Sequence, residues 1–368
     1  MDLIILNKDK LSHIFILISI VFGLLAYEFN LYYLDFYNLF IILQLLFIFI
    51  AIIITKYINL NVGGYLFIYL IFYYFSFVIS ILVNLDFLSL FRFMVFPFVF
   101  VASIYISDRL NIYLKSFILV NIFPALLIFL VFFNGAFLFW DLKYGRGTSI
   151  YFDPNFCAAI LGLSAFLSLI VFKRYGLFLF LFYISAMFLT YSKSAIFSSI
   201  CALLIFLFLR YKLYITLPMI LFSSFVLFAL YSTLDLQMFR LEQGMNSRDN
   251  LWNFAFDIVI NNAEYFGIGS SNLADKLLNN GFENSSTHNN FMDILLQFGV
   301  LPFVLIILLS IYTLIWGIYN RNILTCAFVF MLVMSLSITF TVGGLGILSL
   351  IYTILLISIL LNKKILAI

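Results

Sequence analysis

Arginine, lysine and one histidine in polar segments are the residues of this chain that could do chemistry. Arg146 lies between two glycines in KYGRGTSIYFDPN, and Lys193 lies in TYSKSA. Arg248 and His288 belong to a long polar stretch, Ser232 to Asn290. Cationic side chains bind phosphate oxygens and stabilise charge that grows on them, and a histidine accepts a proton near neutral pH. The set favours a substrate with a phosphate leaving group.

Each of these residues also has a structural interpretation. Arg146 fits a solvated loop, Lys193 could extend its ammonium to the membrane surface, and His288 could be an ordinary loop residue. Asp153 followed by Pro154 is typical of a helix start, with a capping carboxylate and then proline at the first helical position.

Arg92 is the one arginine inside an apolar run, in LSLFRFMVF. A buried arginine in a bilayer is costly, so we expect it to face the bundle interior or a water-filled cavity. Asp86 is a candidate partner. A functional role and a structural ion pair remain equally open for Arg92.

The sequence lacks the motifs of nucleotide and metal sites. It has no Walker-type or dinucleotide-binding glycine loop, no HExxH, and no DxD pair in a polar segment. Cys157, Cys201 and Cys326 fall in apolar runs without metal-ligand spacing. We therefore expect no metal, cofactor or disulfide, and no nucleic-acid partner.

Composition places the chain in a membrane. Of 368 residues 65% are hydrophobic and 10% charged, and the mean hydropathy is +1.19. Runs long enough to cross a bilayer must be helical, because backbone polar groups need partners inside the segment. We predict an all-α polytopic protein with about twelve spans, near 11–27, 36–55, 65–83, 88–107, 115–134, 155–172, 176–191, 195–210, 213–231, 291–317, 323–340 and 344–361.

Three regions follow from this layout. Residues 1–231 hold spans one to nine, 232–290 form one large outward loop, and 291–368 hold spans ten to twelve. In the loop we expect a helix of about fourteen residues from Arg248 and a short helix from Ser271 to Asn279.

Basic residues set the orientation. With a cytoplasmic N-terminus, inside segments carry most of the 19 Lys and Arg residues, which predicts both termini inside and the loop outside. We read the first span as retained rather than cleaved as a signal peptide. The inside residues are Lys8, Lys10, Lys56, Arg109, Lys115, Lys173, Arg174, Arg210, Lys212, Arg321, Lys363 and Lys364.

Ordered along the chain, these motifs resemble the O-antigen polymerase and O-antigen ligase superfamily of bacterial envelope proteins. The matching motifs are an arginine with a Pro-Asn pair, a Ser-Lys pair, an arginine before a tryptophan, a Gly-x-Gly turn and a His-Asn pair. They stand at Arg146 with Pro154-Asn155, Ser192-Lys193, Arg248 with Trp252, Gly267-Ile268-Gly269, and His288-Asn289. Lysine at 193 departs from the arginine of many relatives and leaves a point charge in place of a fork.

The resemblance implies polymerisation of undecaprenyl-pyrophosphate-linked oligosaccharide repeat units at the periplasmic face of the inner membrane. Arg146, Lys193 and Arg248 would hold the pyrophosphate in a metal-independent inverting transfer, with Arg92 as a further candidate. Arg248 and His288 would be catalytic, and His288 would orient or deprotonate the acceptor hydroxyl. The lipid-linked oligosaccharide would be donor and acceptor, membrane lipid would surround the protein, and a chain-length regulator is an expected partner.

Two alternatives stay open. An O-antigen ligase would transfer the glycan onto lipid A core with the same residues. A flippase for lipid-linked oligosaccharide is the alternative from another class, but such transporters usually show two similar halves, and we find no convincing internal repeat.

Overall fold

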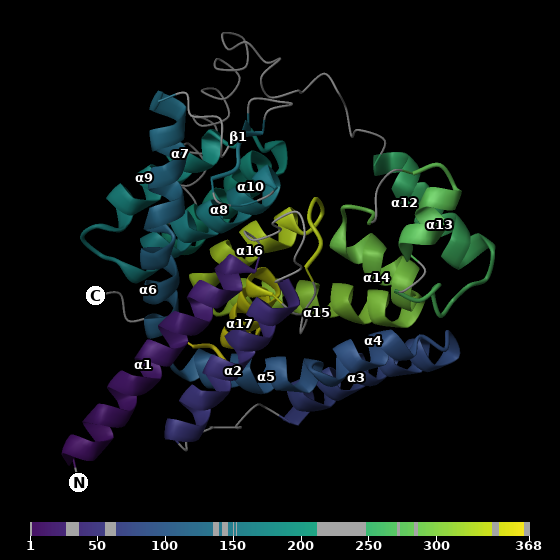
Figure 1. Cartoon of the computed structure of the whole chain (residues 1–368), viewed down its shortest axis with the longest axis horizontal. Coiled ribbons are helices and arrows are strands. Elements are labelled where there is room, and N and C mark those ends of the chain that lie inside the picture. Colours follow the sequence, from purple (N-terminus) through teal and green to yellow (C-terminus); the bar gives the residue numbers. More distant parts are fainter. Residues whose placement is uncertain are drawn as a thin grey trace.

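The chain folds into a helical bundle, which confirms the predicted all-α class (Figure 1). One short ribbon interrupts it, where β1 (Trp140–Asp141) pairs antiparallel with β2 (Arg146–Gly147). The structure is a computed structural model that describes residues 2–26, 37–55, 64–134, 140–141, 146–149, 151, 153–211, 248–270, 273–282, 286–340 and 346–363. The span expected at 213–231 lies outside the described residues, as do residues 232–247 of the predicted loop.

Several helices are suited to a bilayer by length and composition. In the described part of the chain five segments qualify as candidate spans: α3 (Gly64–Val83), the run Leu110–Leu130, α8 (Pro154–Val171), α10 (Lys193–Arg210) and α15 (Val300–Tyr319). Leu110–Leu130 covers α6 (Leu110–Val120) and most of α7 (Ile122–Asn134). The shorter apolar helices are most of α2 (Tyr37–Thr55), α5 (Phe96–Asp108), α9 (Gly176–Phe188), α16 (Leu324–Met334) and α17 (Ile347–Leu360). The total of twelve spans and their orientation remain predictions.

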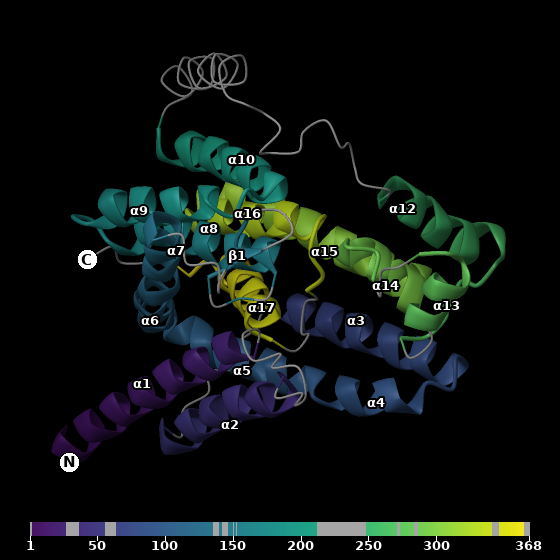
Figure 2. The same ribbon diagram turned by 45° about the horizontal axis from the view of Figure 1, so that its top comes forward.

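Helix α8 lies inside the bundle and packs against α9, α10 and α16 (Figures 1 and 2). Its sequence suits this position, because small residues such as Ala158 and Ala165 allow neighbouring helices to approach closely. Its buried serines are satisfied within the helix: Ser164 Oγ donates to Ile160 O at 2.8 Å and Ser168 Oγ to Ser164 O at 2.7 Å. A buried helix can thus carry hydroxyls without leaving them unpaired.

Besides the junction of α6 and α7 at Asn121, within 115–134, two of the expected spans are broken. The run 88–107 is two helices, α4 (Phe87–Met94) and α5, with Pro97 in the first turn of α5. A proline is tolerated in a first turn but not in a helix interior. The run 291–317 is likewise divided at Gly299, into α14 (Asn290–Phe298) and α15. A single uninterrupted helix at either place is therefore wrong.

The described part of the polar stretch before α14 forms two helices, as predicted. The first runs from Arg248 through α12 (Arg248–Phe256) and a π-helical turn (Asp257–Asn261), 14 residues in all (9 + 5). The second is α13 (Leu273–Asn279). Leu251, Ala255 and Leu277 are buried against Leu295 and Leu296 of α14. This group lies beside α3 and α4 in both ribbon views (Figures 1 and 2).

The Gly-x-Gly turn locks this group to the bundle. Ile268 N donates to Leu296 O at 2.9 Å and Gly269 N to Gln297 O at 3.1 Å, while Val300 N donates to Tyr265 O at 3.0 Å. The backbone of residues 265–269 therefore pairs with the break between α14 and α15.

The same turn is fastened to the α3–α4 connection. Ser270 N donates to Asp86 Oδ2 at 2.9 Å, and Asn84 Nδ2 donates to Phe266 O at 3.0 Å. These two contacts hold the Gly-x-Gly turn in place between α3 and α14.

Helix direction separates two charged ends of the bundle. α8 begins at Asp153 and is followed by Lys173 and Arg174, and α10 runs from Lys193 to Arg210. Each has 18 residues and is about 27 Å long. Lys173, Arg174 and Arg210, three of the residues that we assigned to the cytoplasm, thus lie about a membrane's hydrocarbon thickness from the Asp153 and Lys193 ends of these helices.

Replacing Gly299 by alanine should destabilise the protein. Its φ of 86° and ψ of −168° lie in a region almost restricted to glycine, and a Cβ would stand 2.0 Å from Tyr265 O. Gly281 is the matched control, because its φ is also positive at 82° but a Cβ there would meet nothing within 4 Å. We expect Gly281→Ala to lose only about 1–2 kcal/mol. The measurement is thermal unfolding in detergent. Equal unfolding midpoints for the two variants would contradict the close packing of Gly299 against residues 265–269.

Candidate functional site

The first part of the site is built at the start of α8. The Asp153 carboxylate caps the helix, since Oδ1 accepts from Asn155 N at 2.5 Å and from Phe156 N at 3.2 Å. Pro154 takes the first helical position. The predicted cap is therefore confirmed.

Arg146 is bound to this helix start and to the α9–α10 turn. Its Nε donates to Thr190 O at 3.0 Å and its Nη2 to Asn155 Oδ1 at 3.1 Å. The next residue donates from Gly147 N to Leu189 O at 3.0 Å. Arg146 is partly buried and held on two sides, so the solvated-loop interpretation does not describe it.

Asn155 joins the Ser-Lys pair to Arg146. Its Oδ1 also accepts from Ser192 Oγ at 2.9 Å, so one amide oxygen binds both the guanidinium and the serine hydroxyl. Ser192 is the N-cap residue of α10, but its hydroxyl makes this contact rather than capping the helix. Lys193, the first residue of α10, is thereby placed near Arg146, where the positive end of the helix dipole adds to the field.

Arg248 begins α12 and reaches the same region. Burial lowers its pKa, and the nearby Asp153 carboxylate opposes that change. A guanidinium stays charged in proteins, so Arg248 is a partly desolvated cation next to the capping acid of α8. An arginine at a helix start opposes the dipole. Its position is thus better suited to a ligand than to helix stability.

His288 lies immediately before α14 in a left-handed conformation, with φ of 53°. Burial lowers its pKa most, and the charge of Arg248 lowers it further, while Asp293 and Asp153 raise it. Groups from α8, α12 and α14 therefore act on this one imidazole. Because the net direction is down, His288 is neutral at pH 7 and can accept a proton.

The backbone next to His288 is fixed on several sides. Asn289 is the N-cap of α14, and its Oδ1 accepts from Phe291 N at 3.0 Å. Trp252 Nε1 donates to Thr287 O at 3.3 Å, which ties the histidine segment to α12. The tryptophan after Arg248 thus has a structural task in the site.

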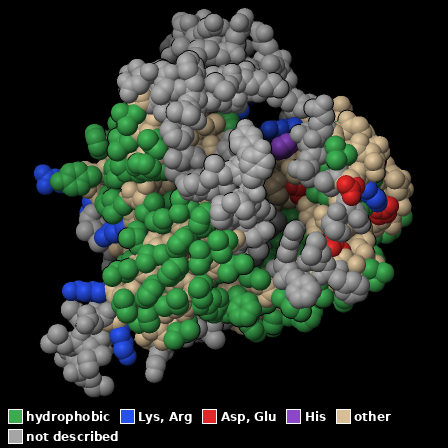
Figure 3. All heavy atoms as spheres, in the orientation of Figure 1, with side chains coloured by type: hydrophobic (Ala, Val, Ile, Leu, Met, Phe, Trp, Pro, Cys, Tyr) green, Lys and Arg blue, Asp and Glu red, His purple; other side chains and the backbone are tan. Residues whose placement is uncertain are grey.

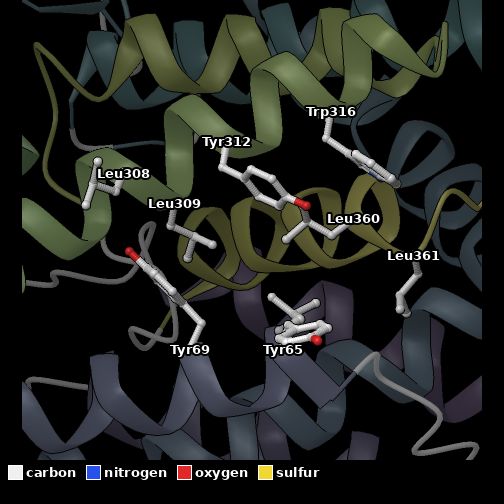
Figure 4. Close-up of a pocket in the computed structure, with 9 residues that line it drawn as sticks. Tyr65, Tyr69, Leu308, Leu309, Tyr312, Trp316, Leu360 and Leu361 are labelled. Carbon is white, nitrogen blue, oxygen red and sulfur yellow. The ribbon is translucent and has the colours of Figure 1, made fainter.

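The surface view agrees with this assembly. Figure 3 shows a histidine beside Lys or Arg side chains, and a broad hydrophobic face on another part of the same view. An apolar pocket of about 530 Å³ lies elsewhere, between α3, α15 and the end of α17 (Figure 4). Tyr65, Tyr69, Tyr312 and Trp316 line it, and it reaches Leu360 and Leu361. It lies toward the end of α15 away from His288 and does not belong to the site.

Comparison with known proteins finds a family model that matches part of the chain. Residues 178–307 match the family model described as O-antigen ligase. This match supports the resemblance of the chain to the O-antigen polymerase and ligase superfamily. No curated protein matches it significantly. Members of that family are membrane glycosyltransferase-like enzymes, and the family match together with the apolar helices suggests a bacterial membrane protein.

The matched segment covers only part of the candidate site. Lys193, Arg248 and His288 lie inside residues 178–307, whereas Arg146 and Asp153 precede them. The fold brings the two sets together, through Asn155 and through the charge of Asp153.

Arg92 is a further candidate from the sequence. It lies on α4, but its side chain is outside the described residues. Its candidate partner Asp86 accepts hydrogen bonds from Ser89 and Ser270. A role for Arg92 stays a prediction.

Sequence reasoning missed three residues of this candidate site. Asp153 was treated only as a cap, although its charge acts on both Arg248 and His288. Asn155 was noted as half of a motif but not as the acceptor that joins two segments. Asp293 was overlooked, and its signal was visible as a lone acid in an otherwise apolar run.

Replacing Arg248 by glutamine should make His288 easier to protonate. The cation holds the pKa of His288 down, so its removal moves the protonation midpoint to higher pH. The chain has only 2 histidines, so ¹³C-histidine NMR in lipid nanodiscs reads His288 directly, with His13 as internal reference. Lys276→Gln is the control, because it removes an equal charge that is paired with Glu264 at 3.1 Å. If the protonation midpoint of His288 stayed the same or fell in Arg248→Gln, the charge of Arg248 would not be acting on His288.

Proposed function

We propose that this protein polymerises undecaprenyl-pyrophosphate-linked oligosaccharide repeat units into O-antigen or a similar surface polysaccharide. The observation that carries the proposal is that Asn155 links Arg146 to the Ser192-Lys193 pair, while Asp153, two residues earlier, acts on Arg248 and on the partly buried His288. Such a site binds a multiply charged leaving group beside a proton acceptor, as glycosyl transfer from a pyrophosphate carrier requires.

The transfer would be inverting and independent of a metal. The acceptor hydroxyl oxygen attacks the anomeric carbon from the face opposite the pyrophosphate. As the new C–O bond forms, the bond to the pyrophosphate oxygen breaks and its electron pair stays with the carrier. His288 takes the hydroxyl proton. The three cations stabilise the charge that grows on the leaving pyrophosphate, in a region where partial desolvation strengthens their effect.

Membrane geometry supports an outward site. The basic residues that favour a cytoplasmic location lie at the other ends of α8 and α10 from the cationic cluster. We therefore place the site at the periplasmic face of the inner membrane, with both termini in the cytoplasm. A lipid-linked donor can then keep its isoprenoid in the bilayer while its pyrophosphate reaches the cluster.

Ligation is the second candidate, because the matched family model is described as O-antigen ligase. The same residues would then transfer the finished glycan onto lipid A core. The two functions differ in the acceptor and not in the chemistry at the pyrophosphate, so products distinguish them.

The decisive experiment offers both acceptors to the purified protein in lipid. With repeat units from its own source, we expect a ladder of products that survives a chelator of divalent metals. Transfer only onto added lipid A core would make the protein a ligase. Neither product from correctly folded protein would return a transporter of lipid-linked oligosaccharide to consideration.

His288→Ala and Arg248→Ala should each reduce product formation by about a hundredfold or more, which is the usual size for loss of a general base or of a charge-stabilising donor. Lys276→Ala on the same loop is the control and should retain activity. Full-length polymer at normal rates from both site variants would show that the site is elsewhere.

Arg146→Lys should be active but impaired, by about tenfold, because lysine keeps the charge and loses the fork that holds Thr190 and Asn155 together. Arg210→Lys, at the other end of α10, should behave as the unaltered protein. Equal rates for the two variants would mean that the fork at position 146 is dispensable.

A further inference from the structure

Asp293 is a buried acid that the transfer mechanism does not use. It lies in the first turn of α14 with an exposed fraction of 2%. Burying a carboxylate is costly unless hydrogen bonds compensate it. A leucine or phenylalanine would suit the interior of this amphipathic helix better, so the acid needs a specific explanation.

The carboxylate connects two segments that are distant in sequence. Oδ1 accepts from the backbone N–H of Thr287 at 2.8 Å, directly beside His288. Oδ2 accepts from the hydroxyl of Thr339, in the segment after α16. The same two segments meet again where Asn290 N donates to Ser335 O at 2.8 Å. One side chain thus fastens the histidine segment to residues 335–339.

Charge gives Asp293 a second effect. The charged groups that act on His288 are Arg248 from α12, Asp153 from the start of α8, and Asp293 from its own helix. Arg248 disfavours an imidazolium, whereas the two carboxylates favour it. Because Asp293 is the more deeply buried of the two acids, its charge is the less screened by water.

We propose that Asp293 is a positioning residue for His288, which holds the histidine backbone against the segment after α16 and balances the charge of Arg248. The catalytic part of this inference rests on the proposed function, whereas the contact between Asp293 and the histidine segment does not. The proposal also extends the site to Thr339, which lies beyond the segment that matches the family model.

The first arm of the test needs no knowledge of the substrate. Asp293→Asn keeps the size of the side chain and removes its charge, so the NMR protonation midpoint of His288 should move to lower pH, opposite to the effect of Arg248→Gln. Asp257→Asn, on the π-helical turn after α12, removes an exposed acid from the same loop and should leave the midpoint unchanged. An unmoved midpoint in folded Asp293→Asn would overturn the proposal, whatever reaction the protein catalyses.

The second arm measures transfer as a function of pH. A base must be neutral, so activity is lost as the pH falls through the pKa of His288, and Asp293→Asn should shift that loss to lower pH. We expect kcat to fall by up to about a hundredfold, the size of a misplaced catalytic group, while the KM for the lipid-linked donor is kept. A purely structural role would lower the amount of active protein and leave the pH profile in place.

Thr339→Val serves if Asp293→Asn does not fold. It removes one hydrogen bond and keeps the charge of Asp293, so the midpoint of His288 should stay and kcat should fall. Thr313→Val is the matched control, because Thr313 Oγ1 donates within α15 to Leu309 O. A normal kcat in Thr339→Val would refute the proposal that Asp293 holds the histidine segment against the segment after α16. If no variant of the protein transfers glycan but the first arm succeeds, the proposed function fails and the positioning of His288 stands.

Discussion

The backbone pairing between residues 265–269 and the break at Gly299 is the constraint on which the site depends. A break in an apolar helix exposes carbonyl and amide groups that a bilayer cannot satisfy, and here the Gly-x-Gly turn satisfies them. The turn needs glycine at both positions, because a Cβ on Gly267 would meet the backbone of Gln297 and one on Gly299 would meet the backbone of Tyr265 and Phe266, and both residues have positive φ. With this pairing in place, α12 lies over α14, and Arg248 and His288 come from helices that can no longer slide apart.

Electrostatics at the site is a balance and not a simple accumulation of positive charge. Arg146, Lys193 and Arg248 come from three segments, and the dipole of α10 adds to them. Asp153 and Asp293 offset this field at His288, which faces the cation of Arg248. The arrangement suits a ligand that brings several negative charges, because such a ligand would compensate cations that the protein itself compensates only in part.

Much of this could be read from the sequence, and the reasons are physical. Long apolar runs predicted helices, Asp153-Pro154 predicted a helix start, and the spacing after Arg248 predicted a helix of the observed length. Each of these depends on local chemistry. The residues of the cationic cluster were also identifiable, because charges in an apolar chain stand out.

The sequence could not predict which of those residues contact one another in the folded protein. Nothing local indicates that Asn155 accepts from both Arg146 and Ser192, which are separated by 46 residues along the chain (192 − 146). The break at Gly299 was missed because the flanking residues are apolar on both sides, and hydropathy is insensitive to a turn of glycine. Asp293 was missed because one acid in an apolar run changes the average little, although it changes the local free energy greatly.

The way Asn155 and Thr339 extend the site has a consequence for how such proteins diversify. Residues 178–307 carry the segment that matches the family model, yet the candidate site extends beyond them to Asn155 and Thr339. In a chimaera that exchanged this segment with that of a relative, the new segment would contact residues of the original chain at two places, at the start of α8 and after α16. Recombination should therefore be tolerated only where the residues at both places are exchanged together with the segment. The flanking residues would then change in evolution together with the segment that they contact.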